Sequence, residues 1–205
     1  MDQKFGAFYS TQKSHLLEKQ VAEQLRRIAT TFKSCQRKIY SSLHWYDNKL
    51  SDEQKSAIDA TLKNGVTVIT GGPGTGKITL VKGLVSAIKK HKLSVTLCAP
   101  TGKAAKRLGE ATGLMKFNPT TIHMHLSDTL RSRSHRYDVM ILDECSMIDL
   151  ELFHNLLSTI PDSAQLILIG DKNQLPPVGA GQPFKDIIEL HQIPNKAAIK
   201  KIIYQ

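Results

Sequence analysis

The sequence predicts an α/β domain in which a parallel sheet carries helices on both faces, preceded by a small helical segment. Short β-branched apolar runs alternate with segments of helical periodicity along most of the chain. A glycine-rich stretch, GGPGTGK, joins the first of these runs to a helix. Each crossover between parallel strands needs its own helix, so this alternation favours helices on the two faces of one sheet.

The composition is that of an ordinary globular domain with an excess of positive charge. The chain has 205 residues, of which 40% are hydrophobic and 22% charged, and its formal net charge is +10. One good core is therefore expected. The charge favours anionic partners, with nucleic acid ahead of an anionic membrane surface. A basic composition without any binding role is the alternative.

The sequence contains no targeting or membrane-spanning signal. No apolar run approaches the roughly 20 residues that span a bilayer, and MDQKFGAFYS lacks the apolar core of a signal peptide. The three cysteines, Cys35, Cys98 and Cys145, stand far apart without metal-ligand spacing. This pattern is typical of a reducing compartment, so we predict a cytoplasmic protein with no membrane partner.

The N-terminal part is predicted to be helical over residues 11–39. Apolar residues recur there at helical spacing, from Leu16 to Ile28, with basic residues between them. We expect this helix to pack against the domain, although its basic face is also suited to DNA. A linker or turn is expected over residues 41–50. Ser51 then begins another helix, with Gln54 completing a capping box.

The remaining elements follow in alternation. Strands are predicted over residues 66–70, 94–100, 138–144 and 164–171, with helices over 79–90, 102–108 and 150–158. The stretch TIHMHL has a strand-like pattern. The polar, basic stretch SDTLRSRSHRYD is expected to be an exposed loop.

The glycine-rich stretch has the spacing of a phosphate-binding loop, G-x-x-x-x-G-K-[ST]. Gly71, Gly76 and Lys77 are in register, and the loop follows a strand and opens a helix. Glycines let the backbone wrap around phosphate, and a helix N-terminus presents free N–H groups. Lys77 would reach the β- and γ-phosphates. The alternative, an ordinary glycine turn, does not explain the full spacing.

Two polar clusters follow later strands. Asp143 and Glu144 end one apolar run, where carboxylates suit a magnesium and water site at the carboxyl edge of the sheet. A solvated strand end is the simpler alternative for such a pair. The loop GDKNQLPPVGAG follows another strand and carries Gln174, an amide that could sense a γ-phosphate or position water. An ordinary Pro/Gly surface turn is the alternative for this loop.

Six segments, in order, resemble the RecD-like branch of superfamily 1 DNA helicases. That branch includes the alpha subunit of exodeoxyribonuclease V and the conjugative relaxase-helicases. The segments are LSDEQKSAI, VTVITGGPGTGK, CAPTGKAAKRL, TIHMHL, ILDECSMID and LILIGDKNQLPPVGAGQPFKDI. The resemblance implies a RecA-like P-loop ATPase domain over residues 49–205, the first of two motor domains, after a helical segment over residues 1–48.

The resemblance also implies a function and roles for individual residues. The activity is ATP-dependent 5′ to 3′ translocation on single-stranded DNA with magnesium, in DNA repair and recombination, with helicase or nuclease partner subunits. Glu144 activates the attacking water, Asp143 holds magnesium, and Gln174 couples the γ-phosphate to the grip on DNA. Gln54 contacts the adenine base. The implied nucleotide-binding set is Gln54, Gly72, Pro73, Gly74, Thr75, Gly76, Lys77, Ile78 and Thr79.

A second implied set contacts the DNA backbone. It consists of Thr101, Gly102, Lys103, Lys106, Arg107, Thr121 and His123. Independently of the resemblance, Lys103, Lys106 and Arg107 place phosphate-directed charge beside a helix N-terminus. His123 is a weak candidate metal ligand because the stretch has no cysteine partner.

Ile78 departs from the phosphate-loop pattern, which has Ser or Thr at this position to ligate magnesium. Thr79 cannot stand in, because the next helical position points about 100° away around the axis. We therefore predict weakened nucleotide binding and a larger loss of magnesium-dependent hydrolysis.

The length is the second departure, because superfamily 1 helicases place ATP between two motor domains. The sequence ends close to where the second domain should follow, and no arginine-finger motif appears. A cloned fragment, a truncated product and a free-standing remnant remain open. The alternative function is a non-catalytic, degenerate P-loop module that binds DNA or a protein partner. A P-loop kinase or GTPase is disfavoured, because no guanine-specificity signature is present.

Overall fold

The computed structural model describes residues 12–35, 50–72, 74–90, 92–113, 119–132, 137–189 and 199–204. Its strands are β1 (Val66–Gly71), β2 (Val95–Ala99), β3 (Thr120–Thr121), β4 (Val139–Leu142), β5 (Gln165–Gly170) and β6 (Ile199–Tyr204). Its helices are α1 (Gln12–Cys35), α3 (Asp52–Leu62), α4 (Lys77–Lys90), α5 (Gly102–Thr112), α6 (Ile122–Ser132), α7 (Leu150–Thr159) and α8 (Pro183–Glu189). A 3₁₀ turn, η2, covers Cys145–Met147.

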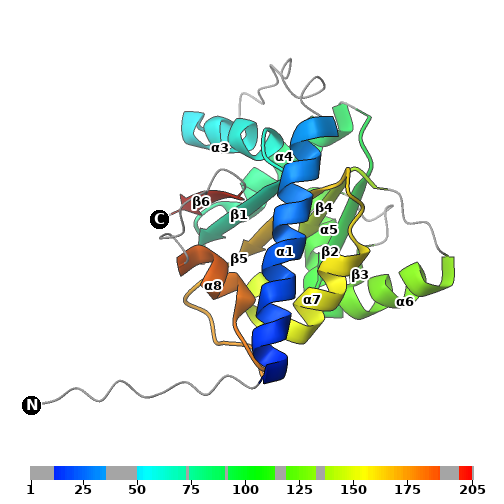
Figure 1. The fold of residues 1–205 in the computed structure, drawn as a ribbon. Coiled ribbons are helices and arrows are strands. Elements are labelled where there is room, and N and C mark those ends of the chain that lie inside the picture. Colours follow the sequence, from blue (N-terminus) through cyan, green and yellow to red (C-terminus); the bar gives the residue numbers. More distant parts are fainter. Residues whose placement is uncertain are drawn as a thin grey trace, which may run out of the picture.

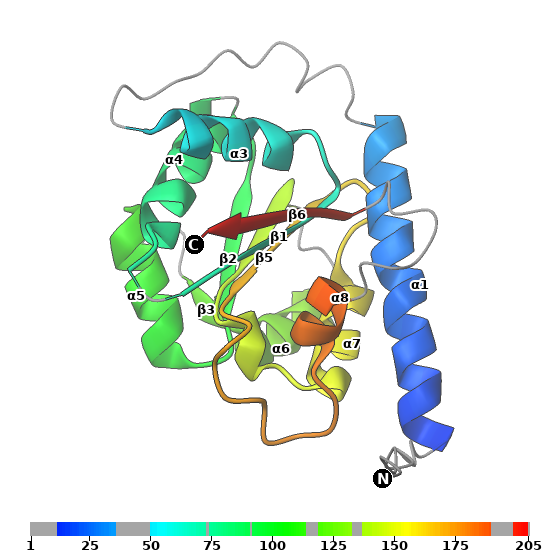
Figure 2. The same ribbon diagram turned by 90° about the vertical axis from the view of Figure 1, so that its left-hand side faces the viewer.

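The six strands form one sheet in the order β3-β2-β4-β5-β1-β6, and every pair is parallel (Figure 1). The predicted α/β fold is therefore confirmed. In β1, β4 and β5 every residue is buried, as expected for strands covered on both faces. β6 adds a strand beside β1 at the edge of the sheet (Figure 2).

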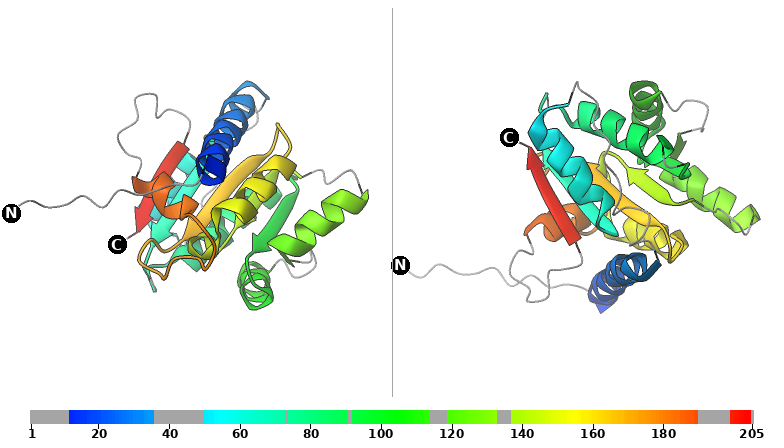
Figure 3. Two further views of the ribbon diagram at one scale, coloured as in Figure 1. Left: turned by 60° about the horizontal axis from the view of Figure 1, so that its bottom comes forward. Right: turned by 90° about the horizontal axis from the view of Figure 1, so that it is seen from above.

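The alternation of side chains along each strand divides the core into two layers. Met140 and Leu142 of β4 pack on the side of α1, α6, α7 and α8. Val139 and Ile141 of the same strand pack on the side of α3, α4 and α5. Figure 3 shows α1 and α7 on one face of the sheet and α3 and α4 on the other. Successive side chains of a strand point to opposite faces, so continuous apolar runs fill both layers.

Helix α1 is part of the folded domain. Ile28 and Ala29 are fully buried against the sheet and α7. Arg27 donates from Nη2 to the carbonyls of Leu157 and Ile160 at 3.2 and 3.1 Å and pairs with Asp162. The arginine thus satisfies carbonyls at the C-terminus of α7. The expectation that this helix packs against the domain is confirmed over its described residues, while residues 36–39 and the linker over 41–49 lie outside them.

The predicted capping box at α3 is confirmed. Gln54 N donates to Ser51 Oγ at 3.2 Å, and Ser51 N donates to Gln54 Oε1 at 3.1 Å. The two side chains together satisfy donors that the first helical turn leaves free. Asp149 caps α7 in a similar way by accepting from Leu152 N at 2.8 Å.

Two local expectations were wrong. Only Thr120 and Thr121 of the TIHMHL region are in a strand; Thr121 Oγ1 accepts from Met124 N at 3.2 Å and α6 begins at Ile122. The supposed loop over residues 127–138 is helical as far as Ser132. Ile122 and His125 are buried three positions apart on one face of α6, a helical rather than strand period. The short β3 and the C-terminal β6 had also not been predicted.

Candidate nucleotide-binding site

The phosphate loop lies between β1 and α4, at the carboxyl end of β1, which β5 and β6 flank in the sheet. Gly74 and Gly76 have φ angles of 76° and 83°, which other residues adopt only with strain. A Cβ on Gly74 would have no heavy atom within 4 Å, so the space beside the loop is open. Leu80 N donates to Gly76 O at 3.0 Å and begins the α4 ladder. The N–H groups of the preceding turn are thus available to an anion. Pro73 lies outside the described residues.

Lys77 is held over this loop. Its Nζ donates to the carbonyl of Gly72 at 2.6 Å and to that of Gly71. The ammonium group therefore lies at the mouth of the loop, where phosphate oxygens would compete for its protons. Binding of the β- and γ-phosphates by Lys77 stays a prediction.

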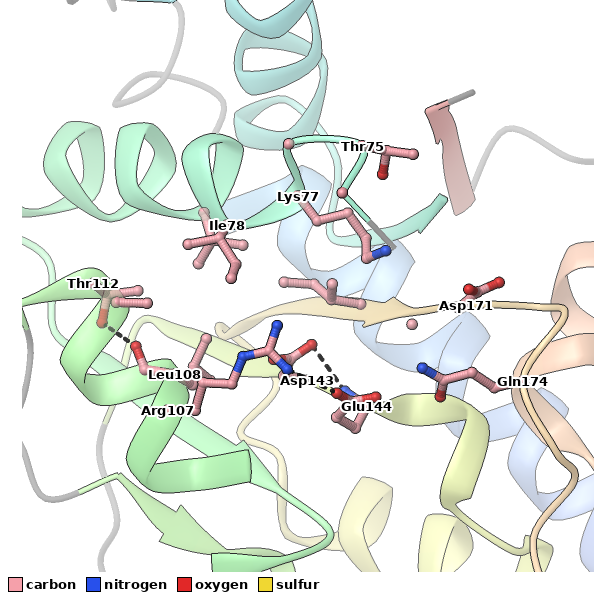
Figure 4. Close-up of a pocket in the computed structure, with 16 residues that line it drawn as sticks. Thr75, Lys77, Ile78, Arg107, Leu108, Thr112, Asp143, Glu144, Asp171 and Gln174 are labelled. Carbon is pink, nitrogen blue, oxygen red and sulfur yellow. Dashed lines mark hydrogen bonds and ion pairs between the residues drawn. The ribbon is translucent and has the colours of Figure 1, made fainter. Parts of the chain in front are cut away.

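A pocket of about 490 Å³ opens at the carboxyl ends of β1, β4 and β5 (Figure 4). In a parallel sheet this edge is where ligands bind. The pocket brings together all four predicted catalytic and metal-binding residues, Lys77, Asp143, Glu144 and Gln174. The full lining is Gly74, Thr75, Gly76, Lys77, Ile78, Val81, Arg107, Leu108, Ala111, Thr112, Asp143, Glu144, Ile169, Gly170, Asp171 and Gln174.

The carboxylates Asp143 and Glu144 follow β4 directly. Glu144 has φ 53° and ψ 39°, the left-handed region, which costs a residue with a side chain about 1–3 kcal/mol. Its backbone N donates to Asp143 Oδ1 at 2.9 Å. Burial raises the pKa of Asp143, while the Glu144 hydrogen bond, Arg107 and Lys77 oppose that shift. The strained turn thus directs both carboxylates to one pocket.

Gln174 is held by residues that the sequence reasoning missed. Ser146 Oγ donates to Gln174 Oε1 at 2.7 Å, which joins the turn after β4 to the loop after β5. Gln174 N donates to Asp171 O at 3.2 Å, and Asp171 Oδ1 accepts from Asn173 N at 2.9 Å. Asp171 is only 5% exposed and lines the pocket. Its signal in the sequence was the one used for Asp143, an acidic residue directly after an apolar strand.

The loop that carries Gln174 is also fixed to α7. Leu150 N donates to Ala180 O at 3.0 Å. A Cβ on Gly179 would collide with the carboxylate of Asp149, the cap of α7. The loop therefore needs glycine at this point, where Gly179 and Ala180 join it to the start of α7.

Ile78 lies in the pocket wall. Its side chain is 38% exposed and shares the wall with Val81, Leu108 and Ala111. Thr79 is exposed and is not among the lining residues. The structure thus agrees with the expectation that Thr79 does not replace the missing hydroxyl. The pocket wall is therefore apolar at the position where the phosphate-loop pattern has a hydroxyl ligand for magnesium.

Gln54, the predicted adenine contact, lies beside the phosphate loop but outside the pocket lining. Gln54 does not line the pocket, because its side-chain oxygen completes the cap of α3. Its Nε2 nevertheless lies 3.4 Å from where a Cβ on Gly76 would stand. Gln54 is therefore beside the phosphate loop with its amide nitrogen toward it.

The predicted DNA-contacting residues lie at the starts of two neighbouring helices. Thr101, at the N-cap of α5, and Gly102, Lys103 and Lys106 on α5 are exposed, and His123 is exposed on α6. Thr101 caps α5 by accepting from Ala104 N at 3.2 Å, as Thr121 does for α6, so both threonines have structural roles. Arg107 differs, because it lines the nucleotide pocket, with Nη1 3.9 Å from Glu144 Oε1.

The donor set fits the phosphates of a nucleotide and fits magnesium only in part. The open glycine loop and Lys77 suit phosphate. Asp143 offers a carboxylate to a metal, whereas Ile78 offers no oxygen. Among the described residues, no three or more His, Cys, Asp or Glu side chains are grouped so as to hold an ion. Magnesium binding would therefore depend on the phosphates themselves.

Together, the glycine loop, its lysine and the facing carboxylates define a P-loop nucleotide-binding domain. Comparison with known proteins narrows this class. A family model described as AAA domain matches residues 49–205, and the chain belongs to this family.

The chain is also homologous to RecD-type helicases over most of its length, which confirms the resemblance of the six segments. An ATP-dependent RecD2 DNA helicase of Deinococcus radiodurans is 41% identical over 75% of this chain and 23% of that protein. A RecBCD enzyme subunit RecD of Haemophilus influenzae is 34% identical over 86% of this chain and 33% of that protein. The chain thus spans about a third or less of the length of these relatives.

A solved structure of Pif1 helicase from Candida albicans is 26% identical over 75% of this chain and 40% of that chain, with a TM-score of 0.48. Within the described ranges, no helix is both long enough and apolar enough to span a bilayer.

Proposed function

We propose that this chain is the first motor domain of an ATP-dependent DNA helicase that moves 5′ to 3′ on single-stranded DNA. The observation that carries the proposal is the convergence of Lys77, Asp143, Glu144 and Gln174 on one pocket at the carboxyl edge of the sheet. The homology to RecD-type helicases supports DNA as the substrate class. We further propose that the domain works in the cytoplasm with partner subunits, in DNA repair and recombination.

Each residue has a distinct task in this proposal. The backbone of the glycine loop and Lys77 bind the phosphates, and Glu144 orients a water and accepts its proton at a carboxylate oxygen. Gln174 contacts the γ-phosphate and relays its presence through the loop fixed to α7. Magnesium, when bound at Asp143, would neutralise charge on the phosphates. Thr101, Gly102, Lys103 and Lys106 of α5 are proposed to hold the DNA backbone, with Thr121 and His123 near the same track.

Ile78 sets the limit on this activity. A branched apolar side chain replaces a hydroxyl in the pocket wall, so nucleotide binding should persist through the loop and Lys77. If metal placement is lost, the activation barrier to hydrolysis should rise by several kcal/mol, and the rate should fall accordingly. Ile78 also favours the second candidate function, a non-catalytic module that binds DNA or a protein partner.

A calorimetric titration distinguishes the two. ATP and ADP are titrated with and without magnesium into the native chain and into Ile78→Thr. The motor-domain proposal predicts weak, magnesium-independent binding to the native chain and magnesium-enhanced binding to the variant, by about tenfold or more in affinity. Absence of nucleotide binding by both proteins would reject the motor-domain proposal and favour the binding module.

The DNA part of the proposal has its own test. Binding of a fluorescent single-stranded oligonucleotide is followed as salt is raised, for the native chain and for Lys103→Gln with Lys106→Gln. Removing two phosphate contacts should weaken binding and make the salt dependence shallower. An unchanged salt slope would exclude these two lysines from the DNA track.

A further inference from the structure

Arg107 is the one predicted DNA contact that the structure places in the nucleotide pocket. It lies on α5, and its guanidinium extends toward Asp143 and Glu144 (Figure 4). Its Nη1 is 3.9 Å from Glu144 Oε1, longer than a hydrogen bond, and its side chain is 66% exposed. The guanidinium is therefore attracted to the carboxylate without being fixed by it.

The charges around the pocket are unbalanced. Among the described lining residues, the cations are Lys77 and Arg107, and the anions are Asp143, Glu144 and Asp171. A nucleoside triphosphate would add several negative charges to this set. Lys77 supplies one positive charge and also donates to two loop carbonyls, so a second cation beside the outermost phosphate would offset more of the added charge.

Arg107 shares the pocket with an apolar wall. Ile78, Val81, Leu108 and Ala111 form an apolar wall of the same pocket. An apolar wall lowers the local dielectric constant and strengthens the attraction between a guanidinium and a phosphate. Ile78 also removes the hydroxyl that would hold magnesium, which leaves part of the phosphate charge to be met by the protein.

We propose that Arg107 is a ligand of the terminal phosphate of the bound nucleotide, exchanging its loose pairing with Glu144 for N–H donation to phosphate oxygens. The planar guanidinium presents several donors and suits this contact. The inference rests on the proposed function, because it takes this pocket as the nucleotide site. Its consequence is that release of Glu144 from Arg107 accompanies triphosphate binding, so the proton acceptor becomes free when ATP is present.

Titration of ATP and ADP in EDTA tests the inference without relying on hydrolysis. Arg107→Gln should weaken ATP binding about tenfold and ADP binding much less, because a charge-assisted hydrogen bond to the γ-phosphate is lost. Arg107→Lys should restore part of the ATP affinity. Arg131→Gln, a matched change of an exposed arginine on α6 outside the pocket, should leave both affinities unchanged.

These titrations distinguish the role of Arg107 from the proposed nucleotide binding on which it rests. Equal ATP affinity for the native chain and Arg107→Gln, or equal losses for ATP and ADP, would overturn the role of Arg107 alone. Failure of the native chain and Ile78→Thr to bind any nucleotide would overturn the proposed function as well. Matching thermal unfolding curves for the variants would show that Arg107→Gln acts on binding and not on folding.

Discussion

The contact between α1 and α7 and the nucleotide pocket lie on the same sheet but are built in opposite ways. At the first, Ile28, Ala29 and Phe153 are buried and Arg27 satisfies the end of α7. In the second, Glu144 adopts a strained backbone and the carboxylate of Asp143 is raised in pKa by burial. The difference indicates that one region stabilises the domain while the other gives up stability for binding.

The largest expected effect is at the packed region. Phe153 is 2% exposed and ranks among the largest buried side chains. Phe153→Ala should lower the free energy of unfolding by about 3–5 kcal/mol, from lost burial and the cavity left behind. Urea unfolding measures the change. Leu130→Ala, at a side chain 85% exposed, is the control and should alter stability by less than about 0.5 kcal/mol.

A loss below about 1 kcal/mol for Phe153→Ala would contradict the division into two regions. It would mean that α7 is not part of the cooperative core. Nucleotide affinity of this variant, measured well below its unfolding midpoint, should match that of the native chain because Phe153 does not line the pocket.

Lys77→Ala should weaken nucleotide binding and leave stability almost unchanged, the reverse of Phe153→Ala. ATP affinity is expected to fall about 100-fold, because a charge-assisted contact to the phosphates is removed from a partly buried position. The free energy of unfolding should stay within about 0.5 kcal/mol of the native value. Lys82→Ala, on the same helix but exposed and outside the pocket, is the matched control. Equal affinity losses for both lysines would indicate nonspecific electrostatics.

The contrast between the two regions also explains what the sequence could predict. The phosphate loop and the pair Asp143 and Glu144 were found because fixed spacing and strand ends define them locally. The four central strands were found because their continuous apolar runs reflect burial on two faces. These signals need no knowledge of distant contacts.

Other features depend on contacts that local patterns do not record. The residues after Thr121 were read as strand-like, but the Thr121 hydroxyl caps α6 at this point, and the buried face of α6 needs α7 and the sheet beside it. Ser146 was overlooked because its partner, Gln174, is 28 positions away. Arg107 was grouped with DNA contacts by its neighbours in the sequence, although its place on α5 brings it to Glu144.

A smaller effect on stability is expected at Asp143. Burial there disfavours the charged carboxylate, whereas burial of Phe153 stabilises the fold. Its folded pKa lies above the usual 3.8 because burial removes water from the carboxylate. The folded protein therefore binds more protons than the unfolded one near this pH. The stabilising contribution of Asp143 is fully present below pH 3.8 and is lost as pH rises through the raised pKa.

Asp143→Asn in magnesium-free buffer should consequently be more stable than the native chain at pH 7. The difference should shrink as pH falls toward 3.8, which thermal unfolding across this range would show. Asp52→Asn is the contrasting control, since it removes an exposed carboxylate from the first turn of α3 and should cost about 0.3–1 kcal/mol. A destabilised Asp143→Asn would mean that the buried carboxylate stabilises the fold, and that the pocket does not give up stability at this residue.

The smallest effect on binding is expected on the α1 side of the molecule. Arg26 is exposed, whereas Arg27 is engaged by Leu157, Ile160 and Asp162. Replacing both arginines by alanine should hardly change affinity for single-stranded DNA. The same variant should lose about 1–2 kcal/mol of stability, because the C-terminus of α7 loses two donors.

Fluorescence anisotropy with a single-stranded oligonucleotide at two salt concentrations measures the DNA affinity. Urea unfolding measures the free energy of unfolding. A large, salt-sensitive loss of DNA affinity in a variant that remains folded would mean that α1 contributes to the DNA track. Arg26→Ala alone then identifies the source, because Arg26 is exposed while Arg27 is committed to α7. An unchanged affinity with lowered stability would place the basic residues of α1 with the packed region, separate from the pocket and from the exposed lysines of α5.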